Sequence, residues 1–149
     1  LENSVTSLRE KPMVGTISTY IAFNGNTTEA LKHWQEVFGG ELNLLTYGQL
    51  TLEGMPFDPP ADALAHGVLT LDNGGLISGS DSFEGEMLVK DTAYSMLYNA
   101  ESVEDGRARI DKIVAAGGEE AMKFEQAPWG GFFGQVFDKF GVMWNISSD

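Results

Sequence analysis

Hydrophobic residues recur at helical spacing in two segments of the chain. The first segment follows Asn26, and its apolar members are Ala30, Leu31, Trp34, Val37 and Phe38. Spacings of three and four residues place these side chains on one face of a helix. We expect Asn26 to cap this helix, Glu29 to complete a capping box and Gly39 to end it. The second segment follows Ser102, ends at Gly117 and Gly118, and has its apolar residues at Val103, Ile110, Ile113 and Val114.

Alternating segments, typical of β-strands, precede both predicted helices. In the first, Ile17, Ile21 and Phe23 share one face, and Ser18, Tyr20 and Ala22 share the other. In the second, Tyr94, Met96, Tyr98 and Ala100 alternate with Ser95, Leu97 and Asn99. Further strands are predicted at 42–47, 66–71 and 76–80 after the first helix, and at 120–125, 132–137 and 142–146 after the second. Each half of the chain is therefore predicted to run strand–helix–strand–strand–strand.

This repeat predicts the fold class. We expect an α+β protein in which two pseudo-symmetric βαβββ modules form a curved eight-stranded mixed sheet, with a central cleft and the helices outside. Module 1 is predicted at residues 14–85 and module 2 at 91–147, within a single domain at 13–149. Residues 1–12 are interpreted as a flexible lead or a remnant of a fusion.

Composition excludes several classes of function. The 22 Asp and Glu residues against 9 Lys and Arg residues give a formal net charge of −13. This charge argues against nucleic acid and against anionic membranes as partners. The absence of cysteine excludes disulfides, Cys-ligated zinc and thiol nucleophiles. With no apolar run of about 18 residues, we expect no membrane-spanning helix and, by default, a cytoplasmic protein.

A series of short motifs runs through residues 14–147. In order, they are Tyr20-Ile-Ala-Phe-Asn-Gly-Asn26 leading into Glu29-Ala-Leu31, Val37-Phe-Gly-Gly40, Gly54-Met-Pro-Phe-Asp58, His66, Ser78-Gly-Ser-Asp81, Trp129-Gly130 and Asp138-Lys-Phe-Gly-Val-Met-Trp144. Together they resemble the vicinal oxygen chelate superfamily, which includes glyoxalases, extradiol dioxygenases and fosfomycin-resistance proteins. Within it, the chain is most similar to the PhnB-like branch. Members of this branch often carry a ubiquinone methyltransferase label, but nothing in this sequence resembles a methyl-donor site.

The resemblance implies a divalent cation held by His, Glu or Gln on the first and last strands of each module. The residues of this chain at those positions are Ser18 (or Thr19 after a one-residue slip), Gly79, Ser95 and Asn145. Hydroxyl and amide groups bind such cations more weakly than imidazole or carboxylate, and glycine has no side chain. We therefore expect neither a metal nor another cofactor.

Other residues have two interpretations each. His33 is expected in solvent, while His66 is expected to face the cleft, as a hydrogen-bonded strand residue or as an acid–base group. Five aromatic residues belong either to the core or to a cleft wall: Tyr20, Trp129, Phe132, Phe133 and Phe137. The acidic segment that begins at Asp81 is expected in solvent. The loop at 49–62 is interpreted as a lid or binding loop, as a mobile connection, or as a dimer contact.

The preferred interpretation is a homodimer that binds a small apolar or aromatic molecule without metal. The predicted ligand-binding residues are Ser18, Tyr20, His66, Gly79, Ser95, Trp129 and Asn145. The alternative is a lyase, isomerase or dioxygenase type of enzyme that uses His66 or a non-standard metal site. A third possibility is a structural or regulatory dimer whose cleft is filled by side chains.

Overall fold

The computed structural model describes residues 15–50, 58–83, 85 and 89–149. The predicted lead at 1–12 and the middle of the predicted loop at 49–62 lie outside these ranges. The chain divides into two units, Leu1–Met87 and Leu88–Asp149, and each unit is described by itself below.

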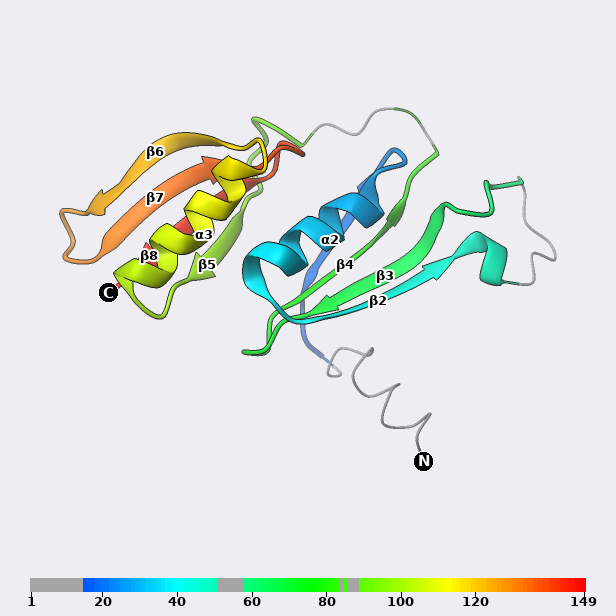
Figure 1. Cartoon of the computed structure of the whole chain (residues 1–149), viewed down its shortest axis with the longest axis horizontal. Helices are drawn as coiled ribbons and strands as arrows, with labels where there is room; N and C mark the ends of the chain where they lie inside the picture. The colour runs from blue at the N-terminus through cyan, green and yellow to red at the C-terminus, as the bar shows by residue number, and fades with distance from the viewer. Residues whose placement is uncertain (1–14, 51–57, 84, 86–88) are drawn as a thin grey trace. The chain divides into compact units, whose positions relative to one another are not determined.

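The first unit is a four-stranded sheet with one long helix across one face (Figure 1). Its elements are β1 (Thr19–Phe23), α2 (Thr27–Phe38), β2 (Glu41–Thr46), the short 3₁₀ helix η1 (Tyr47–Gln49), β3 (Leu64–Thr70) and β4 (Leu76–Asp81). The strand order is β1-β4-β3-β2, with β1 and β4 parallel and the other pairs antiparallel. The helix crosses between β1 and β2 and packs on all four strands.

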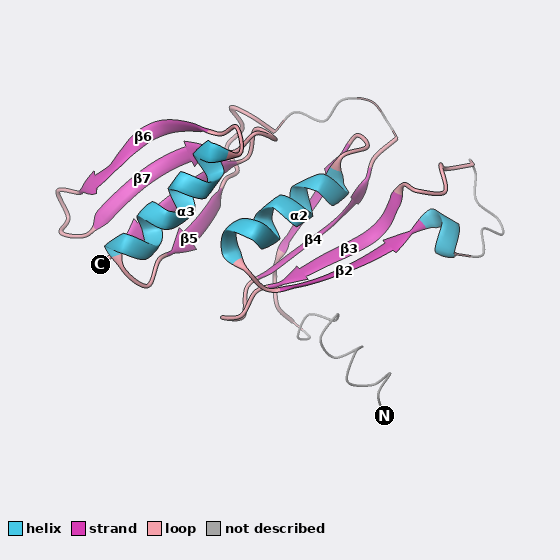
Figure 2. Cartoon of the chain, in the orientation of Figure 1, coloured by secondary structure: helices cyan, strands magenta, loops and turns pink. Residues whose placement is uncertain are grey.

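The second unit repeats this arrangement (Figure 2). Its elements are β5 (Met96–Asn99), α3 (Val103–Ala115), β6 (Glu119–Gln126), β7 (Phe132–Phe137) and β8 (Met143–Ser148). The strand order is β5-β8-β7-β6, and β5 and β8 are parallel. The predicted α+β class and the βαβββ order of each half are confirmed. The eight strands form two four-stranded mixed sheets.

The core of the first unit lies between α2 and its sheet. Leu31 and Trp34 of α2 are fully buried, as is Leu69 of β3, and Ile77 of β4 is 2% exposed. The prediction for His33 was wrong, because this residue is only 5% exposed. His33 follows Ala30 by three residues, so it extends the flank of the apolar stripe. The buried arc of the helix is therefore wider than the apolar residues alone predicted.

The core of the second unit lies between α3 and its sheet. Ile113 of α3, Val136 of β7 and Ile146 of β8 are fully buried. Two glycines make room for Phe124 on β6: a Cβ on Gly106 would lie 2.8 Å from its ring atom Cζ, and a Cβ on Gly134 would lie 2.8 Å from its Cα. Glycine at these two sites allows the helix to approach the aromatic ring and β7 to approach the backbone of Phe124.

A buried carboxylate caps the first helix in place of the predicted Asn26 side chain. Asn26 occupies the N-cap position but makes no side-chain cap hydrogen bond. Instead, Asp81 at the end of β4 accepts from Thr27 N over 3.1 Å and from Leu64 N over 2.9 Å. Asp81 is 8% exposed, so the prediction that it is solvated was also wrong. In contrast, Ser102 caps α3 with its own side chain, which accepts from Asp105 N.

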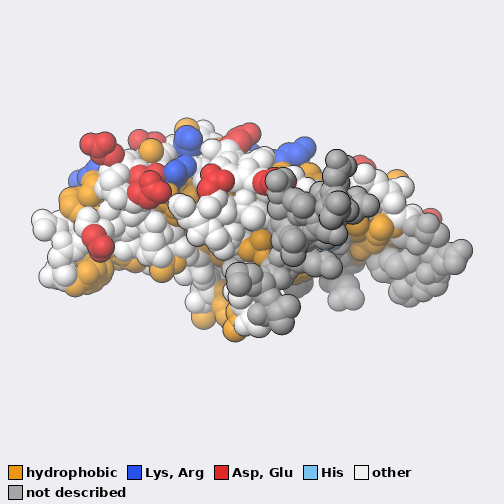
Figure 3. All heavy atoms as spheres, turned by 90° about the horizontal axis from the view of Figure 1, so that it is seen from below, with side chains coloured by type: hydrophobic (Ala, Val, Ile, Leu, Met, Phe, Trp, Pro, Cys, Tyr) orange, Lys and Arg blue, Asp and Glu red, His pale blue; other side chains and the backbone are white. Residues whose placement is uncertain are grey.

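Acidic residues dominate the charged surface. Asp and Glu side chains are scattered over the face drawn in Figure 3, with fewer Lys and Arg among them. Within the described ranges, no helix is both long and apolar enough to cross a membrane.

Candidate binding site on the helix-free sheet faces

Each sheet has one face that does not carry the helix of its unit, and we call it the helix-free face. Side chains of paired residues project from the same face, so the strand register identifies its members. On the first sheet, the central row is Tyr20, Ser78, Val68 and Asn43. On the second sheet, the equivalent row is Leu97, Asn145, Gln135 and Met122.

The expected position of Gly79 was wrong by one residue. A Cβ on Gly79 would lie 2.8 Å from Cγ2 of Thr27, so this residue faces α2 and not the helix-free face. The residue that corresponds to Asn145 is Ser78, because Ile77 and Trp144 are both buried and precede them in the strand.

The cause of this error is the pair of glycines in the β3–β4 turn. Making Gly79 the equivalent of Asn145 requires Gly75 to be the equivalent of Gly141, but Gly74 is the glycine whose N–H donates back to Leu71 O, as that of Gly141 donates to Asp138 O. Both of these glycines have a positive φ, 94° for Gly74 and 88° for Gly141. The repeat therefore aligns on Gly74, the residue whose backbone conformation favours glycine.

Tyr20, His66 and Ser80 lie together on the helix-free face of the first sheet. The Tyr20 hydroxyl donates to Ser80 Oγ over 2.7 Å, and the Tyr20 and His66 rings stack with centroids 6.5 Å apart. Tyr20 is 57% exposed, and His66 is exposed as well. The structure therefore brings two of the predicted residues, Tyr20 and His66, into contact. Ser18 is exposed just before β1.

Asn43 on β2 is a residue that the sequence analysis missed. It pairs with Val68, which is in register with Ser78 and Tyr20, and so lies on the helix-free face. Its Nδ2 atom is buried and has no hydrogen-bond partner among the described residues. Because most buried polar groups are hydrogen-bonded, this amide has unused donor capacity. The alternation of β2 could have indicated it, since Asn43 is a polar residue between two leucines.

A row of uncharged polar side chains crosses the helix-free face of the second sheet. Asn145 Nδ2 donates to Ser95 Oγ over 2.7 Å and to Met96 O over 3.1 Å. Asn145 Oδ1 accepts from Gln135 Nε2 over 2.9 Å. The two predicted residues Ser95 and Asn145 are therefore in direct contact. Gln135 joins them, although the sequence analysis did not select it.

Exposed apolar side chains lie at the two ends of the central row and in the β6–β7 turn. Leu97 is 58% exposed, Met122 is 50% exposed and Trp129 is 72% exposed. The Trp129 ring contacts the Phe133 ring edge-on at a centroid distance of 5.8 Å. Of the two interpretations of Trp129, the core is excluded by its exposure. In contrast, Phe132 faces the helix side, where its ring lies 5.6 Å from that of Phe124.

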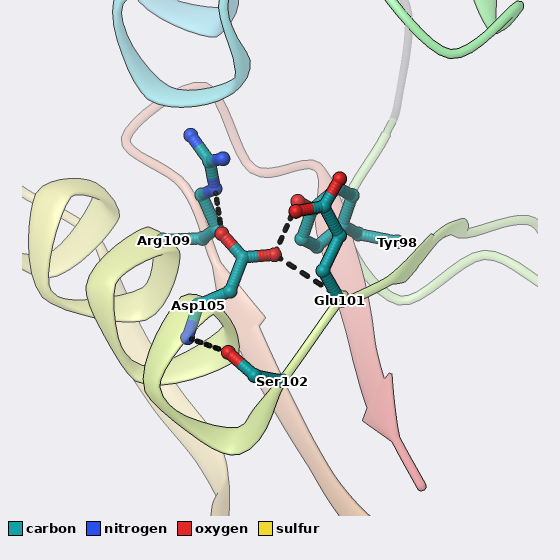
Figure 4. A network of polar contacts seen from close by, with 5 residues as sticks. All are labelled: Tyr98, Glu101, Ser102, Asp105 and Arg109. Atoms are coloured by element: carbon teal, nitrogen blue, oxygen red, sulfur yellow. Dashed lines mark hydrogen bonds and ion pairs between the residues drawn. The ribbon is translucent and has the colours of Figure 1, made fainter.

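The opposite side of the second sheet carries a charged network at the start of α3 (Figure 4). Asp105 accepts from the Tyr98 hydroxyl over 2.6 Å, from Glu101 N over 3.0 Å and from Arg109 Nε over 2.9 Å. Burial alone would raise the pKa of Asp105, but the hydrogen bonds from Tyr98 and Glu101 and the charge of Arg109 outweigh burial and lower it. Burial, together with the hydrogen bond to Asp105, raises the pKa of Tyr98. The Asp105 carboxylate thus joins three donors at the first turn of α3, and this network stabilises the helix start.

Comparison with protein families identifies the fold. A model of the glyoxalase/bleomycin resistance protein/dioxygenase superfamily matches residues 16–146. The chain belongs to this superfamily.

Individual relatives in the superfamily cover nearly the whole chain. Protein YjdN of Escherichia coli is 30% identical over an alignment 146 positions long, which covers 88% of this chain and 93% of that protein. Protein PA1353 of Pseudomonas aeruginosa is 25% identical, with a TM-score of 0.74 over 90% of this chain and 97% of the other. A PhnB protein of Bacillus cereus, described as a putative 3-demethylubiquinone-9 3-methyltransferase, is 22% identical, with a TM-score of 0.70 over 90% of this chain and 99% of the other. The last similarity concerns the fold alone.

The side chains at the superfamily's expected metal positions do not fit a divalent cation. Both N–H groups of Asn145 are donated, one to Ser95 and one to the Met96 carbonyl, and its Oδ1 atom accepts from Gln135, so this neutral amide is already hydrogen-bonded at both ends. On the first sheet, Ser18 and Ser78 offer neutral hydroxyl groups, which bind transition metals weakly. In the described part of the chain, no group of three or more His, Cys, Asp or Glu side chains could hold a metal ion.

Proposed function

We propose that this chain is a PhnB-like member of the superfamily that binds a small apolar or aromatic molecule on a helix-free sheet face without a metal ion. The observation that carries the proposal is the composition of that face on the second sheet. There, the hydrogen-bonded row Ser95–Asn145–Gln135 lies beside the exposed side chains of Leu97 and Met122. Ligand sites typically combine apolar walls with a few fixed polar groups, and this face has both.

Exposed aromatic rings support the same proposal. Trp129 in the β6–β7 turn and Tyr20 on the first sheet are more than half exposed, and each contacts a second ring, Phe133 and His66 respectively. Aromatic side chains supply large contact areas to a ligand, and offset or edge-on arrangements with a bound ring add to the affinity.

Native mass spectrometry of the protein purified from its own host tests the proposal directly. We expect a bound organic molecule of small mass and no stoichiometric metal. A ligand that binds only the native state raises the thermal midpoint of unfolding. Since we expect no metal site, addition of Zn²⁺, Ni²⁺, Mn²⁺ or Fe²⁺ should leave that midpoint unchanged. A large, saturable rise with any one of these cations would contradict metal-independent binding.

A homodimer is part of this proposal. Two apolar side chains at equivalent places in the repeat are almost fully exposed: Ile17 before β1 at 99% and Tyr94 before β5 at 89%. Because β1 and β5 are edge strands of their sheets, a second copy of the chain could cover these positions. Light scattering after size exclusion should give twice the mass of 16.2 kDa, and Tyr94→Ser should reduce that mass to one chain. A single-chain mass for the unaltered protein would refute the dimer.

An acid–base enzyme is the second candidate, because His66 is exposed next to the Tyr20 ring. Imidazole can donate and accept protons near neutral pH. An activity found for this protein that survives His66→Ala unchanged would eliminate His66 as its acid or base.

A further inference from the structure

The backbone fixes the direction of the polar row on the second sheet. Asn145 Nδ2 donates to the carbonyl oxygen of Met96, and a carbonyl oxygen can only accept. The amide nitrogen of Asn145 must therefore face Met96 and Ser95, and its oxygen must face Gln135. As a result, Gln135 must donate to Asn145, and Ser95 must accept from it.

This direction determines which groups remain for a ligand at the two ends of the row. Since Ser95 Oγ accepts from Asn145, its own hydroxyl proton points away from the row and is a donor. Since Gln135 donates to Asn145 through Nε2, its Oε1 atom is the acceptor at the Gln135 end of the row. This oxygen accepts no hydrogen bond from the described residues. Ser95 is exposed and Gln135 is half-buried. The row thus presents one donor and one acceptor.

The length of the row matches a carboxamide. The amide of Asn145 already connects Ser95 to Gln135 through hydrogen bonds of 2.7 and 2.9 Å. A second amide of the same length can lie over that of Asn145 in the opposite sense, accepting from the Ser95 hydroxyl and donating to Gln135 Oε1. Both hydrogen bonds would have ordinary lengths of about 2.8–2.9 Å.

The surroundings of the row are apolar and carry few charges. Leu97 and Met122 lie at its two ends in the same register. The register places Glu119 and Glu125 of the edge strand β6 on this face, and Nζ of Lys90 lies 5.0 Å from the centre of the Phe137 ring. None of them belongs to the row itself.

We propose that the helix-free face of the second sheet selects neutral carboxamides or lactams attached to a flat apolar body, and discriminates against the corresponding carboxylates. This inference rests on the proposed function and names the class of its ligand. The flat body lies against Phe133 beside Trp129, and the carboxamide lies over Asn145. A carboxylate has only acceptors, so it satisfies Ser95 but faces Gln135 Oε1 with a second oxygen. It also loses hydration between Leu97 and Met122 without a cation in the row.

Two isosteric probes test this selectivity: naphthalene-2-carboxamide and naphthalene-2-carboxylate. Binding is followed by tryptophan fluorescence and by protection of that fluorescence from acrylamide quenching. Trp129 dominates the quenchable signal, because Trp34 is fully buried and Trp144 is 3% exposed. At pH 7 we expect the carboxamide to bind at least about tenfold more tightly than the carboxylate, which corresponds to one hydrogen bond and one avoided repulsion.

Three variants assign the selectivity to the row. Ser95→Ala and Gln135→Leu should each bring the ratio of the two dissociation constants towards one, mainly by weakening the carboxamide. Ser95→Thr keeps the hydroxyl and should restore most of the ratio. Ser147→Ala is the matched control and should leave the ratio unchanged. Ser147 lies on the same strand and face as Asn145, and its side chain makes no hydrogen bond within the described part of the chain. Circular dichroism melting of each variant ensures that only folded protein is compared.

The outcomes separate this inference from the proposed function. If the carboxylate binds as tightly as the carboxamide, the inference is wrong, although a small aromatic molecule still binds. If Ser95→Ala and Gln135→Leu leave the ratio unchanged, the row does not determine selectivity and the inference is again wrong. If neither probe protects Trp129, this face does not bind flat aromatic molecules, and the proposed function fails together with the inference.

Discussion

The turn between β7 and β8 depends on one buried carboxylate, Asp138, whose removal can be predicted quantitatively. Asp138 is 4% exposed. Its Oδ1 atom accepts from Phe140 N over 2.9 Å and from Val142 N over 3.0 Å, and its Oδ2 atom accepts from Trp144 Nε1 over 3.0 Å. In Asp138→Asn, the oxygen can keep the two backbone donors, but the new NH₂ group then faces the indole N–H. The variant therefore loses the bond to Trp144 and places two donors against each other.

The expected cost follows from the charge and burial of this contact. A hydrogen bond to a charged group contributes about 1.5–3 kcal/mol, and a buried unsatisfied donor costs about 1–3 kcal/mol. We therefore expect Asp138→Asn to reduce the free energy of unfolding by about 2–4 kcal/mol. For a chain of this size, that corresponds to a decrease in melting temperature of roughly 5–15 °C.

A double-mutant cycle with Trp144→Phe isolates the contact between the carboxylate and the indole. Trp144→Phe removes the indole donor, so adding Asp138→Asn to it should cost less than in the unaltered protein. We expect a coupling energy of about 1.5–3 kcal/mol from urea unfolding followed by far-UV circular dichroism. Asp72→Asn is the matched control, because Asp72 is exposed in the β3–β4 turn, and it should change stability by less than about 0.5 kcal/mol. A coupling energy near zero would refute the assigned role of the bond.

Other predictions test the register and the charged network. Gly79→Ala should reduce the free energy of unfolding in urea by about 1–3 kcal/mol, because the new Cβ has no room against α2. Ser78→Ala should change that free energy by less than about 0.5 kcal/mol. Equal effects of the two substitutions would contradict the corrected register. Tyr98→Phe should cost about 1 kcal/mol in the same assay, and no change would show that its hydrogen bond is not stabilising. Folding lowers the pKa of Asp105, so its ionised form stabilises the protein fully at pH values above the pKa of the unfolded state, about 3.9. This stabilisation is lost as the pH falls through the lower pKa of Asp105 in the folded state. Unfolding of Asp105→Asn should therefore depend less on pH in that acidic window. Because the pKa of Tyr98 is raised, its contribution is complete below about pH 10 and is lost above it, and Tyr98→Phe should be less sensitive to alkaline pH.

The sequence was sufficient for the element order because local signals agree with the tertiary structure. The helix beginning at Val103 follows Ser102, whose side chain caps it as expected of a serine before an apolar stripe. The strand at Phe132–Phe137 has the predicted bounds. In these segments, the periodicity of the buried residues is produced by the packing of one helix on one sheet.

Long-range contacts explain what the sequence could not indicate. Asp81 is 54 residues from Thr27, so no local pattern shows that it replaces the Asn26 side chain as the cap of α2. In the same way, the contact between Ser95 and Asn145 joins residues that are 50 positions apart. The family resemblance selected both residues, but their pairing with each other and with Gln135 depends on the strand order.

The two repeats share a backbone register but differ in how their polar groups are oriented. On the first sheet, the contact is between two hydroxyl groups, Tyr20 and Ser80, and either can rotate to donate or accept. On the second sheet, Asn145 cannot reverse without turning its oxygen towards the carbonyl oxygen of Met96. An adaptable pair of hydroxyl groups tolerates many ligands, whereas a fixed amide discriminates between donors and acceptors. We therefore expect the helix-free face of the second sheet to discriminate between ligands, and the helix-free face of the first sheet, considered by itself, to tolerate a wider range of them.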